Sequence, residues 1–425
     1  MIRLDGSWPR AVGPLLAIGL LAAPASGQEW TRFRGPNGTG ISEATTVPAE
    51  WSENDYNWNV KLPGVGHSAP VLWGDKIFLT SALEATGTRV VLCLNAADGD
   101  TLWEQRFDSH AGPKHSLNSF ASPTPAVDEE RVYVVWSTPE EYTLLALDHE
   151  GDVVWRRPLG PYWGEHSCGA SPIVYENLLI LGADQGLSKE NPPEAASFLV
   201  AVDRHDGTIR WKVDRRTEFV AYSTPCVYVP EGGQPQLIFN SGAHGISSID
   251  PASGDTLWEL DVFDKRSCSS PIIAGGLIFG STGSGGGGNY VAAVRPPSGP
   301  DEMPRLEYPV IKESAPYVPS LLAYDGLLFL WSDAGVVSCL RVADGKKVWL
   351  HRVGGTYYGS PVCVNGKLYC MNEDGEVVVL AAAEKYKLFG RSPMGEGSHS
   401  TPAVADGRMY LRTYSHLMSI GGAKK

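Results

Sequence analysis

A small set of histidine, tyrosine and arginine side chains is the part of this chain most suited to binding chemistry. Imidazoles that face one space could bind a metal ion, or an anionic ligand beside a guanidinium. Alternatively, these side chains and neighbouring serines satisfy backbone groups. Their spacing along the chain matches no ligand signature, so only the fold could bring them together. The candidates are His67, His115, His166, Tyr222, Arg266, Tyr358 and His399.

No known catalytic motif accompanies these residues. The sequence contains no GxSxG, HExxH or paired-carboxylate motif, and no CxxC or CxxCH. Gly285–Gly288 is not followed by Gly-Lys-Ser/Thr, which argues against a phosphate-binding loop. The formal net charge of −13 argues against a nucleic-acid partner, which would need a basic face. We therefore assign no catalytic residue and leave any metal unspecified.

A repeated sequence unit predicts the fold that holds the candidate residues in place. Self-similarity at a period of about 40–50 residues indicates a repeat architecture. A Ser/Thr/Ala-Pro step opens each unit, and a tryptophan follows a glycine by four residues near its end. The strict copies are Gly99/Trp103, Gly151/Trp155, Gly207/Trp211, Gly254/Trp258 and Gly345/Trp349.

The seventh unit shows the predicted strands most plainly. Pro361–Val364 and Lys367–Met371 flank the hairpin signal Asn365-Gly366, and two further strands are predicted at Glu376–Ala382 and Tyr386–Gly390. Four antiparallel strands per unit make one propeller blade. Eight such units follow one another, with Leu321 replacing the proline that opens the sixth.

The eighth unit ends after three strands, and the start of the mature chain supplies the missing one. Asn54–Trp58 repeats the four-residue spacing to tryptophan. We therefore predict an all-β, eight-bladed β-propeller of four-stranded antiparallel blades whose last blade is closed by the N-terminal strand. It spans residues 54–425 and follows a lead-in at residues 28–53. Its tryptophans are predicted to pack between blades as structural residues: Trp58, Trp103, Trp155, Trp211, Trp258 and Trp349.

In such a propeller the candidate residues ring one mouth of the central channel. Tyr358, His399 and His67 belong to blades seven, eight and one, so they should converge, while His115, His166 and Arg266 lie slightly farther back in equivalent loops. Long connections at residues 81–89, 107–122, 184–197 and 281–289 are predicted on the same face, where function tends to reside. We call the position of the proline that opens each unit, or of Leu321 in the sixth unit, the proline slot. The residues three positions before the eight proline slots are His67, Ser122, Gly169, Tyr222, Cys268, Val318, Tyr358 and His399.

Residues 1–27 are predicted to be a secretory signal peptide. Arg3 and Arg10 precede the apolar run Ala11–Ala23, and small residues precede Gln28. The apolar run is too short to span a membrane, so we expect no transmembrane segment in the mature chain. Because no cysteine occurs in the first 90 residues, we expect an exported protein that is not a lipoprotein.

Three motifs carry a resemblance to a known family. Ala201–Trp211 fits the AxDxxxGxxxW docking motif of quinoprotein alcohol dehydrogenases, and Ser248–Trp258 is a near match with serine for alanine. Trp30–Gly40 looks like the WxxFRGPxGxG opening of planctomycete PQQ-like repeat proteins. The chain therefore resembles the PQQ-like (pyrroloquinoline-quinone-like) β-propeller repeat superfamily, closest in character to BamB-like outer-membrane assembly proteins. The resemblance is specific for fold and weak for function.

The resemblance implies an exported, non-catalytic binding or assembly scaffold in the periplasm or cell envelope. We expect no cofactor, a protein or small-molecule ligand on the propeller face, and a monomer. The alternative is a quinoprotein-like oxidoreductase, dependent on PQQ with calcium or on another metal, with its site at the channel mouth. A third possibility, a carbohydrate-binding or carbohydrate-processing propeller, rests only on the tryptophans and tyrosines expected at the surface.

Overall fold

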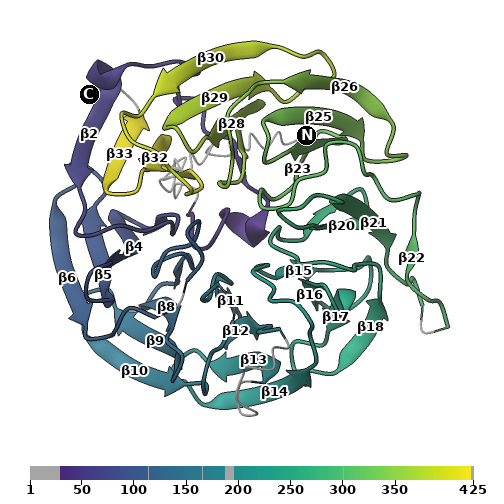
Figure 1. Cartoon of the computed structure of the whole chain (residues 1–425), viewed down its shortest axis with the longest axis horizontal. Helices are drawn as coiled ribbons and strands as arrows, with labels where there is room; N and C mark the ends of the chain where they lie inside the picture. The colour runs from purple at the N-terminus through teal and green to yellow at the C-terminus, as the bar shows by residue number, and fades with distance from the viewer. Residues whose placement is uncertain (1–28, 113, 165, 187–195, 300, 423–425) are drawn as a thin grey trace, which may run out of the picture.

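The repeats fold into blades that stand around a central channel (Figure 1). The computed structural model describes residues 29–112, 114–164, 166–186, 196–299 and 301–422. Within these ranges the strands form eight sheets, seven of four strands and one of five, and the only helices are two short 3-10 turns. The predicted eight-bladed fold is therefore confirmed. The predicted signal peptide lies outside the described residues.

Each blade runs from a short inner strand at the channel to an outer strand at the rim of the ring. Blades one to four are β3 (Val71–Trp73), β4 (Lys76–Leu83), β5 (Thr88–Asn95) and β6 (Thr101–Phe107); β7 (Ala126–Val127), β8 (Arg131–Ser137), β9 (Tyr142–Asp148) and β10 (Val153–Pro158); β11 (Ile173–Tyr175), β12 (Leu178–Ala183), β13 (Ser197–Asp203) and β14 (Ile209–Arg215); β15 (Cys226–Tyr228), β16 (Gln236–Ser241), β17 (Gly245–Ile249) and β18 (Thr256–Leu260).

Blades five to eight continue the same order, with two additions from the start of the chain. They are β19 (Ile272–Ala274), β20 (Leu277–Thr282), β21 (Tyr290–Arg295) and β22 (Arg305–Leu306); β23 (Leu322–Tyr324), β24 (Leu327–Trp331), β25 (Val336–Arg341) and β26 (Lys347–Arg352); β27 (Val362–Val364), β28 (Lys367–Met371), β29 (Glu376–Ala381) and β30 (Leu388–Pro393), with β1 (Ile41–Ser42); β31 (Ala403–Ala405), β32 (Arg408–Arg412), β33 (His416–Gly421) and β2 (Tyr56–Lys61). The 3-10 turns are η1 (Pro36–Gly38) and η2 (Glu53–Asp55).

The two ends of the chain close the ring together, as the sequence predicts. Strand β2 pairs antiparallel with β33 from Tyr56, opposite Ile420, to Lys61, opposite His416. In Figure 1 the purple start of the chain therefore lies beside its yellow end. This pairing completes the eighth blade and covers the outer edge of β33, which would otherwise be open.

Two local predictions differ from the structure. The fourth strand of blade seven begins at Leu388 rather than Tyr386, because the turn before it extends further. The predicted long loop at residues 81–89 is instead mostly strand, since β4 and β5 pair as far as Leu83 opposite Thr88. The polar and small residues there extend a hairpin rather than interrupt it.

The Gly–Trp spacing links five of the blades to the next one. The indole N–H of Trp155 in blade two donates to the Arg204 carbonyl of blade three at 3.0 Å. The same ring covers Gly207, where a Cβ atom would lie 2.8 Å from the indole. The glycine thus meets two needs, a positive φ of 71° and room for the neighbouring indole. Equivalent contacts join Trp58 to Gly99, Trp103 to Gly151 and Trp211 to Gly254, while Trp349 donates to Ala383.

Blades four and five depart from this pattern. The Trp258 indole N–H donates to Gln236 of its own blade at 2.9 Å rather than to a neighbouring blade. Blade five has no Gly–Trp pair, and Tyr308 takes the place of its indole. A Cβ atom on Gly345 would lie 2.6 Å from the Tyr308 ring, and the Tyr308 hydroxyl donates to the Val342 carbonyl at 3.4 Å.

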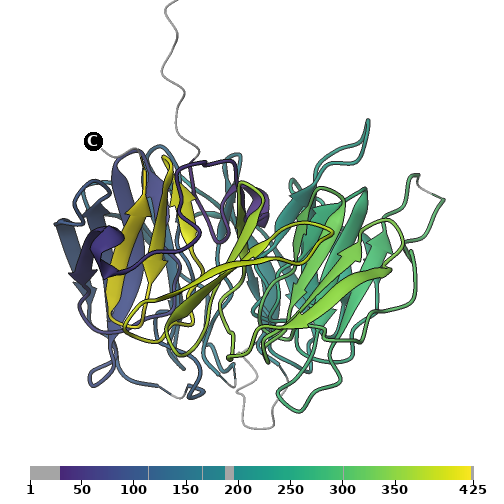
Figure 2. The same cartoon turned by 90° about the horizontal axis from the view of Figure 1, so that it is seen from above.

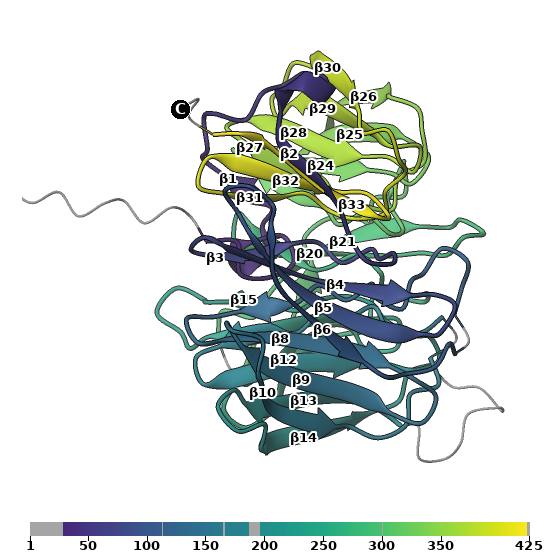
Figure 3. The same cartoon turned by 90° about the vertical axis from the view of Figure 1, so that its left-hand side faces the viewer.

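Residues 30–42 of the N-terminal segment (residues 29–53) lie along inner edges at the channel instead of merely leading into the propeller, whereas Trp51 lies against the outer strand β30, where its N–H donates to Ser392. Figures 2 and 3 show the segment's purple ribbon against one face of the ring. Its backbone and side chains bond to the otherwise open inner edges of four blades. The Trp30 carbonyl accepts from Leu72, the Asn37 amide exchanges two 2.8 Å hydrogen bonds with Val227, and β1 pairs parallel with β27. These contacts cover inner edges that would otherwise be exposed.

Candidate functional site

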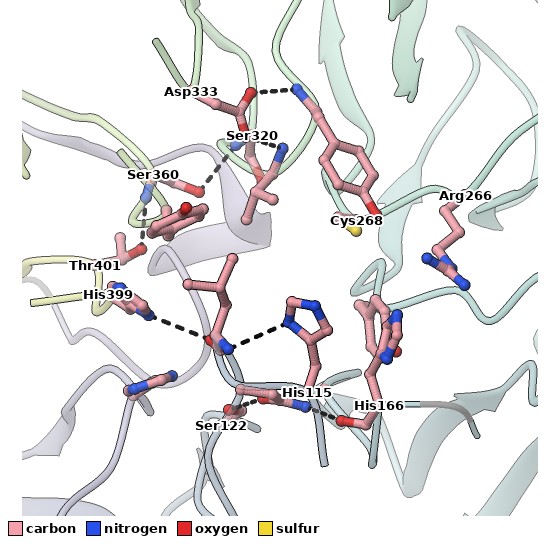
Figure 4. Close-up of a pocket in the computed structure, with 18 of the residues that line it drawn as sticks. His115, Ser122, His166, Arg266, Cys268, Ser320, Asp333, Ser360, His399 and Thr401 are labelled. Carbon is pink, nitrogen blue, oxygen red and sulfur yellow. Dashed lines mark hydrogen bonds between the residues drawn. The ribbon is translucent and has the colours of Figure 1, made fainter. Parts of the chain in front are cut away.

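The channel mouth opposite the N-terminal segment holds a cavity of about 780 Å³. Figure 4 shows the side chains converging on it from loops around the ring. All seven candidate binding residues line this cavity, as do all eight residues that stand three positions before the proline slots. Phe33 of the N-terminal segment also lines it. The structure therefore brings the candidates together, and their role in binding stays a prediction.

A ring of hydroxyl groups holds these loops at fixed spacing. The residue before each proline slot is serine or threonine in every blade except the first, and its hydroxyl accepts the backbone N–H of the same position in the preceding blade. One such bond runs from the Ser270 N–H to Ser320 at 3.1 Å. The Ser/Thr-Pro marker of the sequence thus satisfies buried N–H groups. The complete series is Ala69 to Thr124, Thr124 to Ser171, Ser171 to Thr224, Thr224 to Ser270, Ser270 to Ser320, Ser320 to Ser360 and Ser360 to Thr401.

The ring is interrupted between blades eight and one, where Ala69 has no hydroxyl. The guanidinium of Arg412 connects blades eight and one at this junction instead. Arg412 is fully buried and donates to the carbonyls of Ser68 at 2.9 Å and Thr80 at 2.7 Å, both in blade one. Burial lowers the pKa of Arg412 to about 9, so it stays charged at neutral pH. Ser400 adds a bond to the Ser68 carbonyl at 3.2 Å.

The predicted convergence of blades seven, eight and one produces an aromatic cluster. The His399 ring lies 4.6 Å from His67 and 4.5 Å from Tyr358, between ring centroids. The Leu117 carbonyl can only accept, so His399 carries its proton on Nδ1, 3.3 Å away, and its Nε2 accepts from the Tyr414 hydroxyl at 3.0 Å. Burial lowers the pKa of His67 well below its usual value, and that of His399 also falls. Both imidazoles are therefore neutral at pH 7.

A second histidine pair lies across the mouth, near Arg266. The rings of His115 and His166 are 4.6 Å apart, and His115 Nδ1 accepts the Leu117 N–H at 3.2 Å. Desolvation lowers the pKa of both, and for His115 the neighbouring His166 and Arg266 lower it further. The Arg266 carbonyl accepts from Gly283 at 2.9 Å, which fixes its backbone to the turn between β20 and β21. This pair is neutral as well.

The third wall combines phenols, a thiol and one carboxylate. Asp333 accepts backbone N–H groups of Tyr317 at 2.7 Å and Val318 at 3.0 Å, while burial raises its pKa. Burial also raises the pKa of the Cys268 thiol to about 12, so it is no nucleophile at neutral pH. The Tyr222 hydroxyl is buried and has no hydrogen-bond partner among the described residues.

Sequence reasoning missed several residues at this mouth. Phe33 belongs to the N-terminal segment, outside the repeat, so the repeat could not place it. Asp333 and Tyr414, together with Glu373, occupy the same position in the turns between the second and third strands of blades six, eight and seven. An alignment of those turns, rather than of the proline steps alone, could have found them.

Comparison with known proteins identifies the family. The family model for the outer membrane protein assembly factor BamB matches residues 36–188, 167–302 and 319–420. The chain belongs to this family. No curated protein sequence matches this BamB-family chain. Among the described residues, none of the helices has the length and apolar character that a membrane crossing needs.

Solved structures share the fold of this BamB-family propeller at low identity. BamB from Moraxella catarrhalis is 14% identical with a TM-score of 0.60, covering 86% of this chain and 98% of that chain. The quinohemoprotein alcohol dehydrogenase from Comamonas testosteroni is also 14% identical, with a TM-score of 0.64 and coverage of 94% and 81%. A europium-containing methanol dehydrogenase is 12% identical, with a TM-score of 0.63 and coverage of 91% and 90%. These likenesses show the fold alone.

The cavity of this BamB-family chain does not fit a calcium-bound quinone. Pyrroloquinoline quinone is a flat tricarboxylate, and Arg266 is the single permanent cation among the described lining residues. Asp333 is the one lining carboxylate, and both its oxygens already accept N–H groups. Nowhere in the described part of the chain do three or more His, Cys, Asp or Glu side chains group as a metal site. We therefore derive no step through this cofactor.

Proposed function

We propose that this BamB-family propeller is an exported, non-catalytic binding protein of the periplasm or cell envelope, and that it recognises its ligand at the channel mouth. One observation carries the proposal: the lining gathers neutral hydrogen-bonding side chains from all eight blades around one cavity. Such a cavity, with convergent polar groups on a rigid scaffold, is the usual form of a binding site.

The chemistry of the lining favours binding over catalysis. The four histidines are neutral, but the rings of each pair pack against one another, tilted by 58° and 59°, rather than being aligned with a nucleophile. Burial keeps Cys268 in its thiol form, and both oxygens of Asp333 accept backbone N–H groups. A general base needs an accessible acceptor within reach of a substrate proton, which neither the Cys268 thiol nor the doubly bonded Asp333 offers.

Site-specific photo-crosslinking tests where the partner binds. A photoreactive amino acid is placed at Leu117, which is 39% exposed beside the mouth. The matched control is Lys385, which is exposed in the turn between β29 and β30 on the opposite face. We expect a discrete crosslinked product in cells from position 117 and none from position 385. Crosslinking only from position 385 would place recognition on the other face and refute the proposal.

Two further measurements test export and the enzymatic alternative. Cell fractionation with N-terminal sequencing should find the mature chain outside the cytoplasm, beginning near Gln28; a cytoplasmic chain that retains residue 1 would contradict export. Incubation with PQQ and calcium should give neither tight binding nor dye-linked alcohol oxidation. Turnover that disappears in the His67/His399 double variant would instead establish the oxidoreductase.

A further inference from the structure

We propose that the core of the channel binds a small monovalent anion of the chloride type, held by Arg34 with Arg32 as a second cation beside it. Both arginines belong to the Trp30–Gly40 motif, whose role the proposed function leaves unexplained. The inference goes beyond that function, because neither arginine lines the cavity at the channel mouth. It is carried by the burial of the two guanidinium groups, by their unpartnered N–H donors and by the charges around them.

The two guanidinium groups reach the innermost strands from the N-terminal segment. Arg32 donates to the carbonyl of Pro225, which occupies the proline slot of blade four. Arg34 donates at 3.2 Å to the carbonyl of Pro361, which occupies the proline slot of blade seven, and at 3.5 Å to the Thr39 carbonyl of its own loop. Arg34 is fully buried and Arg32 is 7% exposed. Both positive charges are therefore fixed inside the ring of blades.

Several N–H donors of these two side chains have no partner. Among the described residues, nothing accepts a hydrogen bond from Nε of Arg32 or from Nε and Nη1 of Arg34, and all three nitrogens are buried. A guanidinium has five N–H donors and no acceptor, so only an acceptor or an anion can satisfy them. An unpaired donor on a buried charged group keeps the full penalty of its desolvation.

The side chains near the two arginines supply no opposite charge. Within the described ranges neither Arg32 nor Arg34 forms an ion pair, and no carboxylate is among the groups that shift their pKa values. Burial lowers the pKa of Arg32 to about 10 and that of Arg34 to about 9, so both stay charged at neutral pH. Burial also raises the pKa of the neighbouring Cys226 thiol to about 12 and that of Cys370 well above its usual value. Both thiols are therefore neutral and cannot act as counter-ions.

A single anion meets both needs. It accepts the unpartnered N–H groups of Arg34 and supplies the charge that a buried cation requires. The charge of Arg32 lowers the pKa of Arg34, so the two cations repel each other, and an anion beside one of them offsets that repulsion. Removing one partner of a buried charge is strongly unfavourable, which makes a resident counter-ion the stable arrangement.

The close packing of the motif restricts the anion to a small one. A Cβ atom on Gly40 would lie 2.8 Å from Nη2 of Arg34, and a Cβ atom on Gly35 would lie 2.5 Å from the Trp30 indole. The loop backbone therefore lies directly against these side chains, at a φ of 71° for Gly40 and 64° for Gly35. A halide is a single atom and suits such packing, whereas phosphate or an organic carboxylate needs space for several atoms.

Thermal unfolding at pH 7.5 tests the inference, with sodium chloride and sodium gluconate compared at equal ionic strength. We expect chloride to raise the unfolding temperature in a saturable way, by about 3 °C at about 100 times the dissociation constant, and the larger gluconate anion not to do so. Arg34→Met removes the charge but keeps a long side chain, and it should abolish the difference between the two salts. Arg305→Gln, which changes an exposed arginine on β22, is the matched control and should keep the difference.

Crystals soaked in bromide give a second reading that needs no variant. We expect an anomalous difference peak within hydrogen-bonding distance of the Arg34 guanidinium. An equal response to chloride and gluconate, an unchanged chloride response in Arg34→Met, or bromide peaks only at the protein surface would each overturn the inference. If Arg34→Met does not fold, the position of the bromide peak decides. Photo-crosslinking from position 117 does not depend on this anion, so the proposed binding function is tested separately.

Discussion

The contact between Gly207 and the Trp155 indole gives the sharpest test of how the blades are joined. In Gly207→Ala a Cβ atom would lie 2.8 Å from the indole, at a backbone φ of 71°. The positive φ costs about 1–2 kcal/mol, partly offset by about 0.4–1 kcal/mol of lost unfolded-state entropy. The overpacking adds about 1–3 kcal/mol.

The chain supplies a control that separates these two costs. Gly326 has nearly the same φ, 73°, but an added Cβ there would meet nothing within 4 Å. Gly326→Ala therefore measures the backbone cost alone, and Gly207→Ala should be less stable than it by about 1–3 kcal/mol. Urea unfolding followed by fluorescence and circular dichroism, with coincident transitions, measures both free energies of unfolding.

A double-mutant cycle completes the test. Trp155→Ala alone should cost about 3–5 kcal/mol, because it removes a large buried ring and its bond to the Arg204 carbonyl. In the Trp155→Ala background the added Cβ of Gly207→Ala has no indole to clash with. The double variant should therefore lose about 1–3 kcal/mol less free energy of unfolding than the sum of the losses in the two single variants. Equal stability of Gly207→Ala and Gly326→Ala, or additivity within about 0.5 kcal/mol, would refute the steric link between blades.

Three further predictions concern the channel. Ser320→Ala removes the hydroxyl that accepts the buried Ser270 N–H and should lower the free energy of unfolding by about 1–3 kcal/mol in urea titrations. Asn37→Ala removes both hydrogen bonds to Val227 and should cost about 1–2 kcal/mol, seen as a lower unfolding temperature. Because the pKa of His67 is lowered in the folded state, the unfolded chain binds more protons at this residue, so stability should fall as pH drops below about 6.5. The fall should be smaller in His67→Gln, and the unfolding temperature of both proteins between pH 7.5 and 5.5 measures it.

The repeat made most of the fold predictable, because every blade must satisfy the same packing. The Gly–Trp spacing, the proline steps and the Asn54–Trp58 copy were enough for the blade number and the closure by β2. Strand ends were less predictable, as Leu388 shows, since a turn of variable length precedes each outer strand. The residues that line the channel mouth three positions before the proline slots were predictable for the same reason as the fold, because they occupy one position of the repeat.

What could not be predicted depends on single contacts between distant parts of the chain. Phe33 reaches the mouth because the N-terminal segment bonds to Pro225 and Pro361 through Arg32 and Arg34, about 190 and 330 residues away. Arg412 seals a junction that only the missing hydroxyl at Ala69 makes necessary. Neither residue shares its role with another blade, so the repeat carries no signal for them.

In the loops before the inner strands, one position serves the fold and another, two residues earlier, faces the cavity. Directly before the proline slot, seven of the eight blades have serine or threonine, and each hydroxyl makes the same bond. Two residues earlier the blades differ, with histidine, tyrosine, cysteine, valine, serine and glycine around one ring. If those side chains only satisfied backbone groups, one residue type would serve in every blade, as it does next to the proline slot. Their variety, facing one cavity, is what a ligand without eightfold symmetry requires.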